Sequence, residues 1–172
     1  MNLILKKFLS DPINVGAIKE SSKSSAKKMA DLINSTPTKN VIEIGSGTGI
    51  LSSYLEEKNL TLVERDSSFC NILSNKYPKA KVVNDCGFSF LNSYKPSENF
   101  GIFTSIPLIK KSSVESLTTF LNNNISTSKI DWFIILGYRF ENSFVNLNFK
   151  SKKRYFILNN LPPAFIWKYF ND

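Results

Sequence analysis

The sequence predicts an α/β fold of the Rossmann type, in which a seven-stranded sheet carries helices on both faces and ends in an antiparallel hairpin. Three observations predict it. Apolar runs of strand length alternate with longer segments, one run leads into a glycine-rich turn, and the last two runs lie too close together for a crossover helix. With 172 residues, 42% of them hydrophobic, and no Gly/Ser-rich linker, the chain is expected to form a single domain over residues 1–172.

The strands are predicted from short apolar runs bounded by polar or turn-forming residues. Five of them alternate with helical or connecting segments, at Val41–Ile44, Leu60–Glu64, Lys81–Asn84, Phe100–Ser105 and Asp131–Gly137. Alternation of this kind predicts parallel strands. Two further strands, Lys152–Leu158 and Pro163–Phe170, flank a turn at Asn159–Pro162 and are therefore expected to pair antiparallel.

Helices are expected at Ser21–Ser35, Ile50–Lys58, Ser67–Lys76 and Lys111–Ile125. The third follows Asp66, whose side chain can accept hydrogen bonds from the free N–H groups at the start of a helix. Residues 1–35 are predicted to form an N-terminal helical extension. Its first segment, Met1–Leu9, gathers apolar residues around Lys6 and Lys7, which by itself fits a bilayer surface and the protein's own core equally well. The nearby cations Lys23, Lys27 and Lys28 favour the anionic bilayer.

The turn after the first strand carries the most informative spacing in the chain. Gly45-Ser46-Gly47-Thr48-Gly49 is a G-x-G-x-G motif between a strand and a helix, where glycine lets backbone N–H groups approach a ligand. Ile50 stands where the NAD fingerprint G-x-G-x-x-G has its third glycine, which disfavours NAD. The predicted cofactor is S-adenosylmethionine, with Gly45, Ser46, Gly47 and Gly49 as binding residues.

Three acidic residues near the predicted strand ends extend the cofactor site. Glu64 ends the second strand and is predicted to accept both ribose hydroxyls, and Asp85 follows the third strand and is predicted to accept the adenine amine. Glu43 lies inside an apolar strand, where burial is costly without donors, and is predicted to face the methionine ammonium or backbone amides. The alternatives are surface carboxylates at Glu64 and Asp85 and a structural hydrogen-bond hub at Glu43. The predicted order of five alternating strands and helices followed by an antiparallel hairpin resembles the layout of class I methyltransferases.

The resemblance to class I methyltransferases implies that the loop after the fourth strand, Ser105-Ile106-Pro107-Leu108, presents the methyl acceptor, and its proline fixes a loop there rather than a continued strand. Ser105 and Pro107 are the catalytic candidates. Adenine N6-methyltransferases carry Asn or Asp before this proline and an aromatic residue after it, and Ser105 and Leu108 supply neither, which argues against a nucleic-acid base. Since the chain contains no His, Tyr138 and the weaker candidate Glu20 are the proposed proton acceptors. Aromatic packing explains Tyr138 equally well.

The net charge and the cysteine content limit which partners, metals and cellular compartments the sequence predicts. The net charge of +8 and the pI near 9.5 predict an anionic partner, either nucleic acid or an anionic membrane surface. A basic run at Lys150, Lys152, Lys153 and Arg154 suits both. Two cysteines are too few for a disulfide framework or a zinc site, so no metal and a reducing cytoplasm are predicted. No apolar run approaches the roughly 20 residues of a membrane-spanning helix.

Segments spread along the chain resemble the bacterial phospholipid N-methyltransferases. They are Phe8-Leu9, Val15-Gly16-Ala17-Ile18, Glu20-Ser21-Ser22, the glycine motif from Glu43 to Gly49, Leu62-Val63-Glu64, Ser105-Ile106-Pro107-Leu108 and Leu161-Pro162-Pro163-Ala164. The resemblance implies methylation of the amino headgroup of phosphatidylethanolamine toward phosphatidylcholine. It further implies a cytoplasmic enzyme bound peripherally to the inner membrane, with an anionic membrane surface as partner. The sequence does not give the oligomeric state, for which a monomer is the default. Gly101 departs from the family, which usually has an acid there.

Two other functions remain open from the residues. An rRNA adenine N6-dimethyltransferase-like enzyme is favoured by the basic charge and by the glycine motif. A cofactor-binding or membrane-binding module without turnover is suggested by Gly101 and by the lack of an obvious catalytic base.

Overall fold

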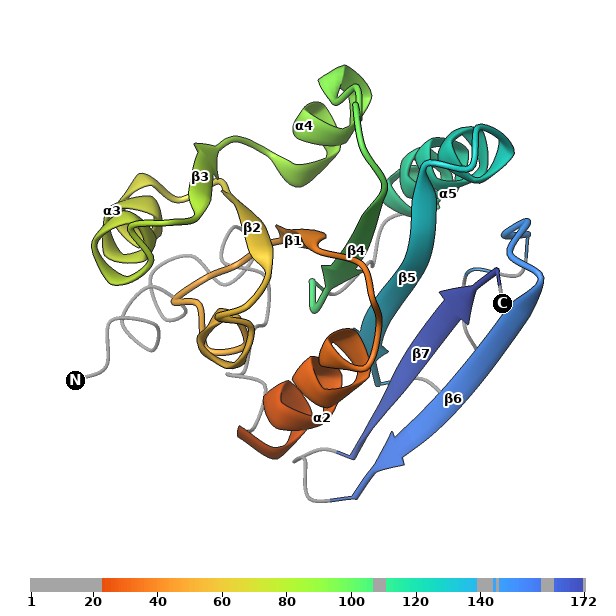
Figure 1. The fold of residues 1–172 in the computed structure, drawn as a ribbon, viewed down its shortest axis with the longest axis horizontal. Helices are drawn as coiled ribbons and strands as arrows, with labels where there is room; N and C mark the ends of the chain where they lie inside the picture. The colour runs from red at the N-terminus through yellow and green to blue at the C-terminus, as the bar shows by residue number, and fades with distance from the viewer. Residues whose placement is uncertain (1–22, 107–110, 139–143, 145, 159–162, 172) are drawn as a thin grey trace.

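The computed structural model describes residues 23–106, 111–138, 144, 146–158 and 163–171. They form a single seven-stranded sheet with the order β3-β2-β1-β4-β5-β7-β6 (Figure 1). The strands are β1 (Asn40–Ile44), β2 (Asn59–Glu64), β3 (Lys81–Asn84), β4 (Phe100–Thr104), β5 (Ile130–Gly137), β6 (Ser151–Ile157) and β7 (Ala164–Phe170). The first five strands are parallel, and β7 pairs antiparallel with β5 and β6. This confirms the predicted fold class, and every predicted strand end lies within one residue of the observed one.

The described helices are α2 (Lys23–Asn34), α3 (Ser67–Lys76), α4 (Gly87–Ser93) and α5 (Lys111–Ser126). Helix α3 has the predicted bounds, and Asp66 caps it by accepting from the N–H groups of Ser68 and Phe69. Helix α4 was not predicted, because glycine, serine and asparagine are poor helix formers and supply four of its seven residues. The segments Met1–Leu9 and Leu161-Pro162, and Glu20, lie outside the described residues.

The helix predicted over Ile50–Lys58 is wrong. Only a short 3-10 turn, η1 (Ser52–Tyr54), forms there. Leu51 and Leu55 are both buried, and their spacing imitates one face of an α-helix. Backbone hydrogen bonds join residues three apart, as from the Leu55 N–H to the Ser52 carbonyl, and the Ser53 hydroxyl donates to the Ile50 carbonyl. Serine side chains compete with the helical pattern in this way.

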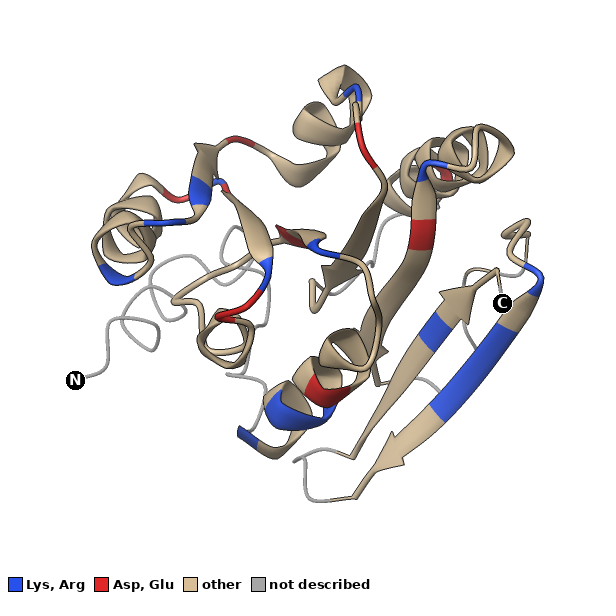
Figure 2. Ribbon diagram, viewed as in Figure 1, with Lys and Arg blue, Asp and Glu red and all other residues tan. Residues whose placement is uncertain are grey.

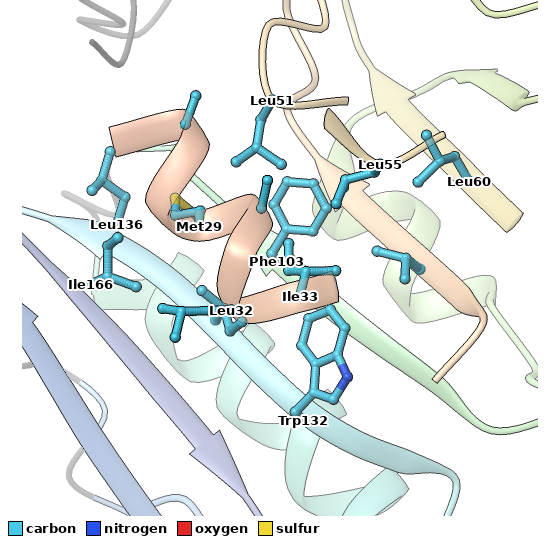
Figure 3. Packing of buried hydrophobic residues seen from close by; sticks show 14 of the residues in the cluster. Met29, Leu32, Ile33, Leu51, Leu55, Leu60, Phe103, Trp132, Leu136 and Ile166 are labelled. Carbon is cyan, nitrogen blue, oxygen red and sulfur yellow. The ribbon is translucent and has the colours of Figure 1, made fainter. Parts of the chain in front are cut away.

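Two apolar clusters lie on opposite faces of the sheet. Helices α2 and α3 and the leucines on either side of η1 contribute to one cluster, and α4 and α5 contribute to the other. In α2 the residues Ala26, Met29, Ala30 and Ile33 follow a helical spacing and are each at most 1% exposed. Figure 3 shows Met29 and Ile33 among side chains of β4 and β5 and of the η1 region. The described part of the predicted N-terminal extension therefore belongs to the core.

The parallel strands end together at one edge of the sheet. Ile44 of β1 pairs with Val63 and Thr104, and Glu64 pairs with Asn84. Because the carboxyl ends of parallel strands meet at one edge, the segments that follow β1, β2, β3 and β4 lie side by side there. In the described part of the chain, no helix is long and apolar enough to cross a bilayer.

Candidate cofactor and acceptor site

The glycine-rich turn begins where β1 ends, and its three glycines have positive φ angles of 77° at Gly45, 53° at Gly47 and 70° at Gly49. Residues with a Cβ rarely adopt such angles. A Cβ on Gly45 would lie 2.3 Å from Ile106 Cγ1, and one on Gly49 would lie 2.5 Å from Tyr77 Cε2. No described atom lies within 4 Å of a Cβ built on Gly47. The turn is thus packed at both ends and open at its centre, where a ligand can approach the backbone.

Glu64 fastens the centre of this turn to the end of β2. Its Oε2 accepts from the Gly47 N–H at 2.9 Å, and its Oε1 accepts from the Asp66 N–H at 2.9 Å. The side chain is 7% exposed. Each carboxylate oxygen has two lone pairs, so each can accept one more hydrogen bond. Glu64 therefore fits a ligand with two neighbouring hydroxyls, such as a ribose, beside Gly47.

The segment after β3 is joined to the same strand end. The Asp85 N–H donates to the Glu64 carbonyl at 3.1 Å, and the Asn84 side chain donates to the carbonyls of Glu64 and Arg65. Asp85 is half-buried, and its Oδ1 accepts from the Cys86 N–H at 2.7 Å. The structure thus brings Asp85 next to Glu64, and its contact with an adenine amine stays a prediction.

Glu43 is a buried carboxyl beneath the turn, 4% exposed. Its Oε2 accepts from the Ser52 hydroxyl at 2.5 Å. Burial raises the pKa of Glu43 from 4.5 to about 8, assisted by the charge of Glu64 and opposed by the Ser52 hydrogen bond and by Lys76. Glu43 is therefore mostly a neutral acid at pH 7 in this structure, and a cation placed beside it would favour its charged form.

Ser46 and Tyr77 hold the two ends of the turn. The Ser46 N–H donates to the Val63 carbonyl at 3.2 Å, and its hydroxyl donates to the Glu43 carbonyl at 3.3 Å. At the other end the Tyr77 hydroxyl donates to the Gly49 carbonyl. These contacts give Ser46 a role in shaping the turn, and its direct contact with a ligand stays a prediction.

The acceptor loop is fastened to the same edge by Thr104. Its buried hydroxyl donates to the Ile44 carbonyl at 2.9 Å and accepts from the Ile106 N–H at 3.1 Å. Ile106 in turn occupies the space that a Cβ on Gly45 would need. Ser105 is half-buried between these two anchors. Pro107 lies outside the described residues.

Tyr138 follows β5 and is 40% exposed. Strand β4 separates β5 from β1, so Tyr138 lies at the same edge two strands away from the glycine turn. The structure does not bring it together with Glu43 and Glu64, and its catalytic role stays a prediction.

Gly101 has a structural explanation. It pairs with Trp132, and a Cβ on it would lie 2.1 Å from Trp132 Cζ2. The indole N–H of that ring donates to Thr38 Oγ1 at 3.1 Å, which holds the ring in place. Gly101 also pairs with Val41, near the start of β1 and away from the glycine turn. An acidic side chain has no room there, so its absence does not count against turnover.

We expect Gly101→Ala to lower the free energy of unfolding by about 3 kcal/mol, because the new methyl group overpacks the Trp132 ring. Urea denaturation measures the loss, and calorimetric titration should give an unchanged S-adenosylmethionine affinity. Gly137→Ala is the matched control, since no described atom lies within 4 Å of a Cβ there. Weaker cofactor binding at normal stability would contradict the structural role.

Three residues of the site were missed by the sequence reasoning: Ser52, Tyr77 and Thr104. Each acts through a partner far along the chain, at 9 residues for Ser52, 28 for Tyr77 and 60 for Thr104. The spacing of residues that are close in the sequence does not predict such contacts. A polar residue at the end of an apolar strand is the one available signal, and it applies to Thr104.

Solved structures of methyltransferases have the same fold. The 23S rRNA methyltransferase ErmE superposes with a TM-score of 0.59 at 19% identity, over 85% of this chain and 68% of that one. A putative O-methyltransferase from Klebsiella pneumoniae gives 0.66 at 11% identity, over 100% and 91%. The N-terminal domain of human METTL16, solved with SAH, gives 0.56 at 11% identity, over 86% and 67%. At these identities the likeness concerns the fold alone.

Curated relatives are more similar in sequence. Ribosomal RNA small subunit methyltransferase A of Hydrogenobaculum sp. (strain Y04AAS1) is 33% identical over 113 residues, which is 63% of this chain and 43% of the relative. The protein of the same name from Maridesulfovibrio salexigens is 33% identical over 86 residues, which is 48% of this chain and 33% of the relative. The chain thus spans less than half the length of either protein.

A family model described as ribosomal RNA adenine dimethylase matches residues 19–162, which is most of the chain. The predicted membership of the phospholipid N-methyltransferases is therefore wrong: it relied on short apolar and proline motifs at the two ends, while the glycine turn is common to both families. The predicted cofactor and the prediction of an S-adenosylmethionine-dependent methyltransferase are confirmed at the level of the family. The chain belongs to the ribosomal RNA adenine dimethylase family.

Proposed function

We propose that this chain is the S-adenosylmethionine-dependent catalytic part of an enzyme that methylates the N6 amine of adenine in ribosomal RNA. Family membership supports the acceptor class, and the relatives are named as ribosomal RNA methyltransferases. The net charge of +8 fits an RNA partner. This was the alternative left open by the sequence.

The observation that carries the proposal is the packing of the acceptor loop on the glycine turn. Ile106 fills the space beside Gly45, and Thr104 ties the loop to the end of β1. Ser105 therefore stands at the edge where the turn is open at Gly47. Holding two reactants in line is the main requirement of methyl transfer, and the contact between the acceptor loop and the glycine turn supports such an alignment.

Each cofactor residue has a distinct role in the proposal. S-adenosylmethionine supplies an electrophilic methyl group when it is bound. Glu64 accepts the ribose hydroxyls with its remaining lone pairs, Asp85 accepts the adenine amine, and Glu43 faces the methionine ammonium. Glu64 and Glu43 are joined to the turn or to η1 by hydrogen bonds, so little reorganisation is needed on binding.

An adenine acceptor also accounts for the lack of histidine. The N6 amine of adenine is uncharged at neutral pH, so its nitrogen needs no prior deprotonation. The proton leaves after the methyl group has been transferred and can pass to water. Tyr138 and Glu20 are then not required as bases, in contrast to their role with a protonated lipid amine.

The predicted partners, an anionic membrane surface and a phospholipid substrate, are wrong. The phospholipid depended on the phospholipid N-methyltransferase resemblance, and the membrane surface also on the basic charge and the N-terminal segment. The family match and the named relatives point to nucleic acid instead, which the same positive charge fits. Peripheral attachment to the inner membrane has no remaining support. Serine and leucine in the acceptor loop argued against a base as substrate, but two residues of one loop weigh less than a match over most of the chain.

The test is transfer of labelled methyl groups to protein-free small-subunit rRNA, followed by digestion to nucleosides. We expect N6-methylated and N6,N6-dimethylated adenosine. Lipid extract assayed in parallel should stay unlabelled. Label in lipid alone, or cofactor binding without any labelled product, would contradict the proposal, and the second outcome would favour a module without turnover.

Ser105→Asn is expected to raise the rate of methyl transfer to RNA about tenfold, because a carboxamide can hold an amine with both a donor and an acceptor. The measurement is single-turnover labelling at saturating RNA. Ser126→Asn is the control, since Ser126 lies in the last turn of α5, away from this edge. An unchanged rate for Ser105→Asn would remove Ser105 from the acceptor site.

A further inference from the structure

The outer surface of the β6–β7 hairpin combines cations with exposed aromatic and apolar side chains. Neither strand contains an acidic residue, and Figure 2 shows Lys and Arg on both. Strand β6 is the edge of the sheet. Its side chains alternate between two faces, with Lys152, Arg154 and Phe156 on one of them and Leu158 continuing the row just after the strand.

The opposite face of β6 is turned toward α2. There Ile157 joins the α2 cluster, and the Lys28 ammonium lies 5.5 Å from the centre of the Tyr155 ring. Phe156 and Leu158, by contrast, are 56% and 69% exposed. Lysines on a sheet edge are a common protection against edge pairing, but exposed Phe and Leu work against that purpose.

The row on β6 is paired with aromatic residues of β7. Phe156 stands opposite Phe165, with ring centres 5.1 Å apart, and Arg154 stands opposite Trp167. The Arg154 guanidinium lies 5.2 Å from the centre of the Trp167 ring and 5.5 Å from that of Phe165. A guanidinium held over aromatic rings is pre-oriented as a flat surface on which a base can stack.

This surface reaches the edge of the sheet that holds the cofactor site. Phe165 pairs with Gly137 at the end of β5, and Thr104, the last residue of β4 before the acceptor loop, pairs with Ile135 two residues earlier. Three interstrand spacings of about 4.8 Å place β6 about 14 Å from β4. A single strand a few nucleotides long can bridge that gap.

We propose that Lys152, Arg154, Phe156, Phe165 and Trp167 form a platform that binds the single-stranded RNA next to the target adenine. Two of its components match two parts of the ligand: cations meet phosphates, and flat side chains meet unstacked bases. The platform rests on the proposed function, since it positions the substrate of that reaction.

The test measures binding of the whole chain to a fluorescent single-stranded RNA of about 12 nucleotides by anisotropy, over a range of salt concentrations. Phe156→Ala should weaken binding about tenfold without changing the salt dependence, because it removes stacking alone. Arg154→Ala should weaken binding by a similar factor and reduce the slope of log K against log salt by about 0.7. Arg154→Lys should keep the slope of log K against log salt but weaken binding, because lysine keeps the positive charge and lacks the planar guanidinium.

Lys153→Ala is the matched control. It makes the same change of charge one residue along the same strand, on the other face, where the Lys153 ammonium lies 5.4 Å from the Phe170 ring centre. Its RNA affinity should stay within twofold of wild type. Thermal denaturation should show that all variants fold, and cofactor affinity should be unchanged.

Equal RNA affinity in Arg154→Ala, Phe156→Ala and wild type would overturn the platform and leave the proposed function standing, provided that RNA is still methylated. Loss of RNA binding in these variants, with no methylation by wild type, would support an RNA-binding surface at these residues, but it would overturn the proposed function and with it the place of this surface next to a target adenine. Absence of RNA binding by wild type would overturn the platform. Binding to phosphatidylglycerol vesicles that these substitutions abolish, with RNA binding unaffected, would overturn the assignment to RNA.

Discussion

Glu64→Gln is expected to weaken S-adenosylmethionine binding about 100-fold and to lower the free energy of unfolding by about 2 kcal/mol. The carboxylate accepts one backbone N–H with each oxygen, and the amide can accept with only one of them. The N–H of Gly47 or of Asp66 would then face an NH2 group. The cofactor loses a charged acceptor for its ribose hydroxyls at the same time.

Isothermal titration and urea denaturation measure the two effects. Glu56→Gln is the matched control, because Glu56 is exposed and lies in the segment between η1 and β2. It should leave both quantities within error of wild type. If Glu64→Gln lost stability but bound the cofactor normally, the carboxylate would shape the turn without contacting the ligand.

The protein without cofactor is expected to lose stability as the pH rises from about 4.5 to about 8, and Glu43→Gln should remove most of that loss. The folded pKa of Glu43 is raised to about 8, above its ordinary value of 4.5. Below pH 4.5 both states hold the proton. Above it the unfolded chain releases the proton while the folded chain retains it, so unfolding becomes easier until the folded pKa is passed.

The size of this loss is on the order of 5 kcal/mol, since each pKa unit corresponds to about 1.4 kcal/mol. Glutamine is nearly isosteric and still offers Ser52 an oxygen. Urea denaturation between pH 5 and pH 8.5 should therefore show a falling curve for wild type and a flatter one for Glu43→Gln, with the variant more stable at pH 8. Parallel curves would show that Glu43 is charged in the folded protein.

Much of the fold could be predicted because its signals are local. Each strand appears as a short apolar run, and the cap of α3 is an Asp followed by two serines. The errors occurred where distant contacts decide the outcome. Leu51 and Leu55 have helical spacing. The Ser52 hydroxyl between them donates to Glu43, however, and the segment forms a 3-10 turn. In the sequence Gly101 stands where the phospholipid N-methyltransferases usually have an acid, but in the structure the Trp132 ring leaves no room for a side chain at this position.

The candidate site also contains residues that local sequence signals predict and residues that only distant contacts bring into place. The glycine motif and the acids at strand ends predicted the cofactor, because backbone approach requires glycine and a ribose requires an acceptor. Of the residues that hold this site, Ser52 and Tyr77 leave no pattern in the sequence, and Thr104 is marked only as a polar residue at the end of an apolar strand. The acceptor was predicted from short motifs at the two ends of the chain and from the Ser105-Ile106-Pro107-Leu108 loop. It was wrong, since the match to a family over residues 19–162 points elsewhere.

The sequence by itself determined the fold class, the cofactor and the basic character of this protein, because spacing, glycine content and charge are properties of neighbouring residues. Only the tertiary structure decided which side chains contact one another. It brought Thr104 to the end of β1, and it laid Arg154 over Phe165 and Trp167 at the sheet edge. The reason is physical: these contacts join strands that are distant along the chain, and their geometry is set by register and packing of the whole sheet.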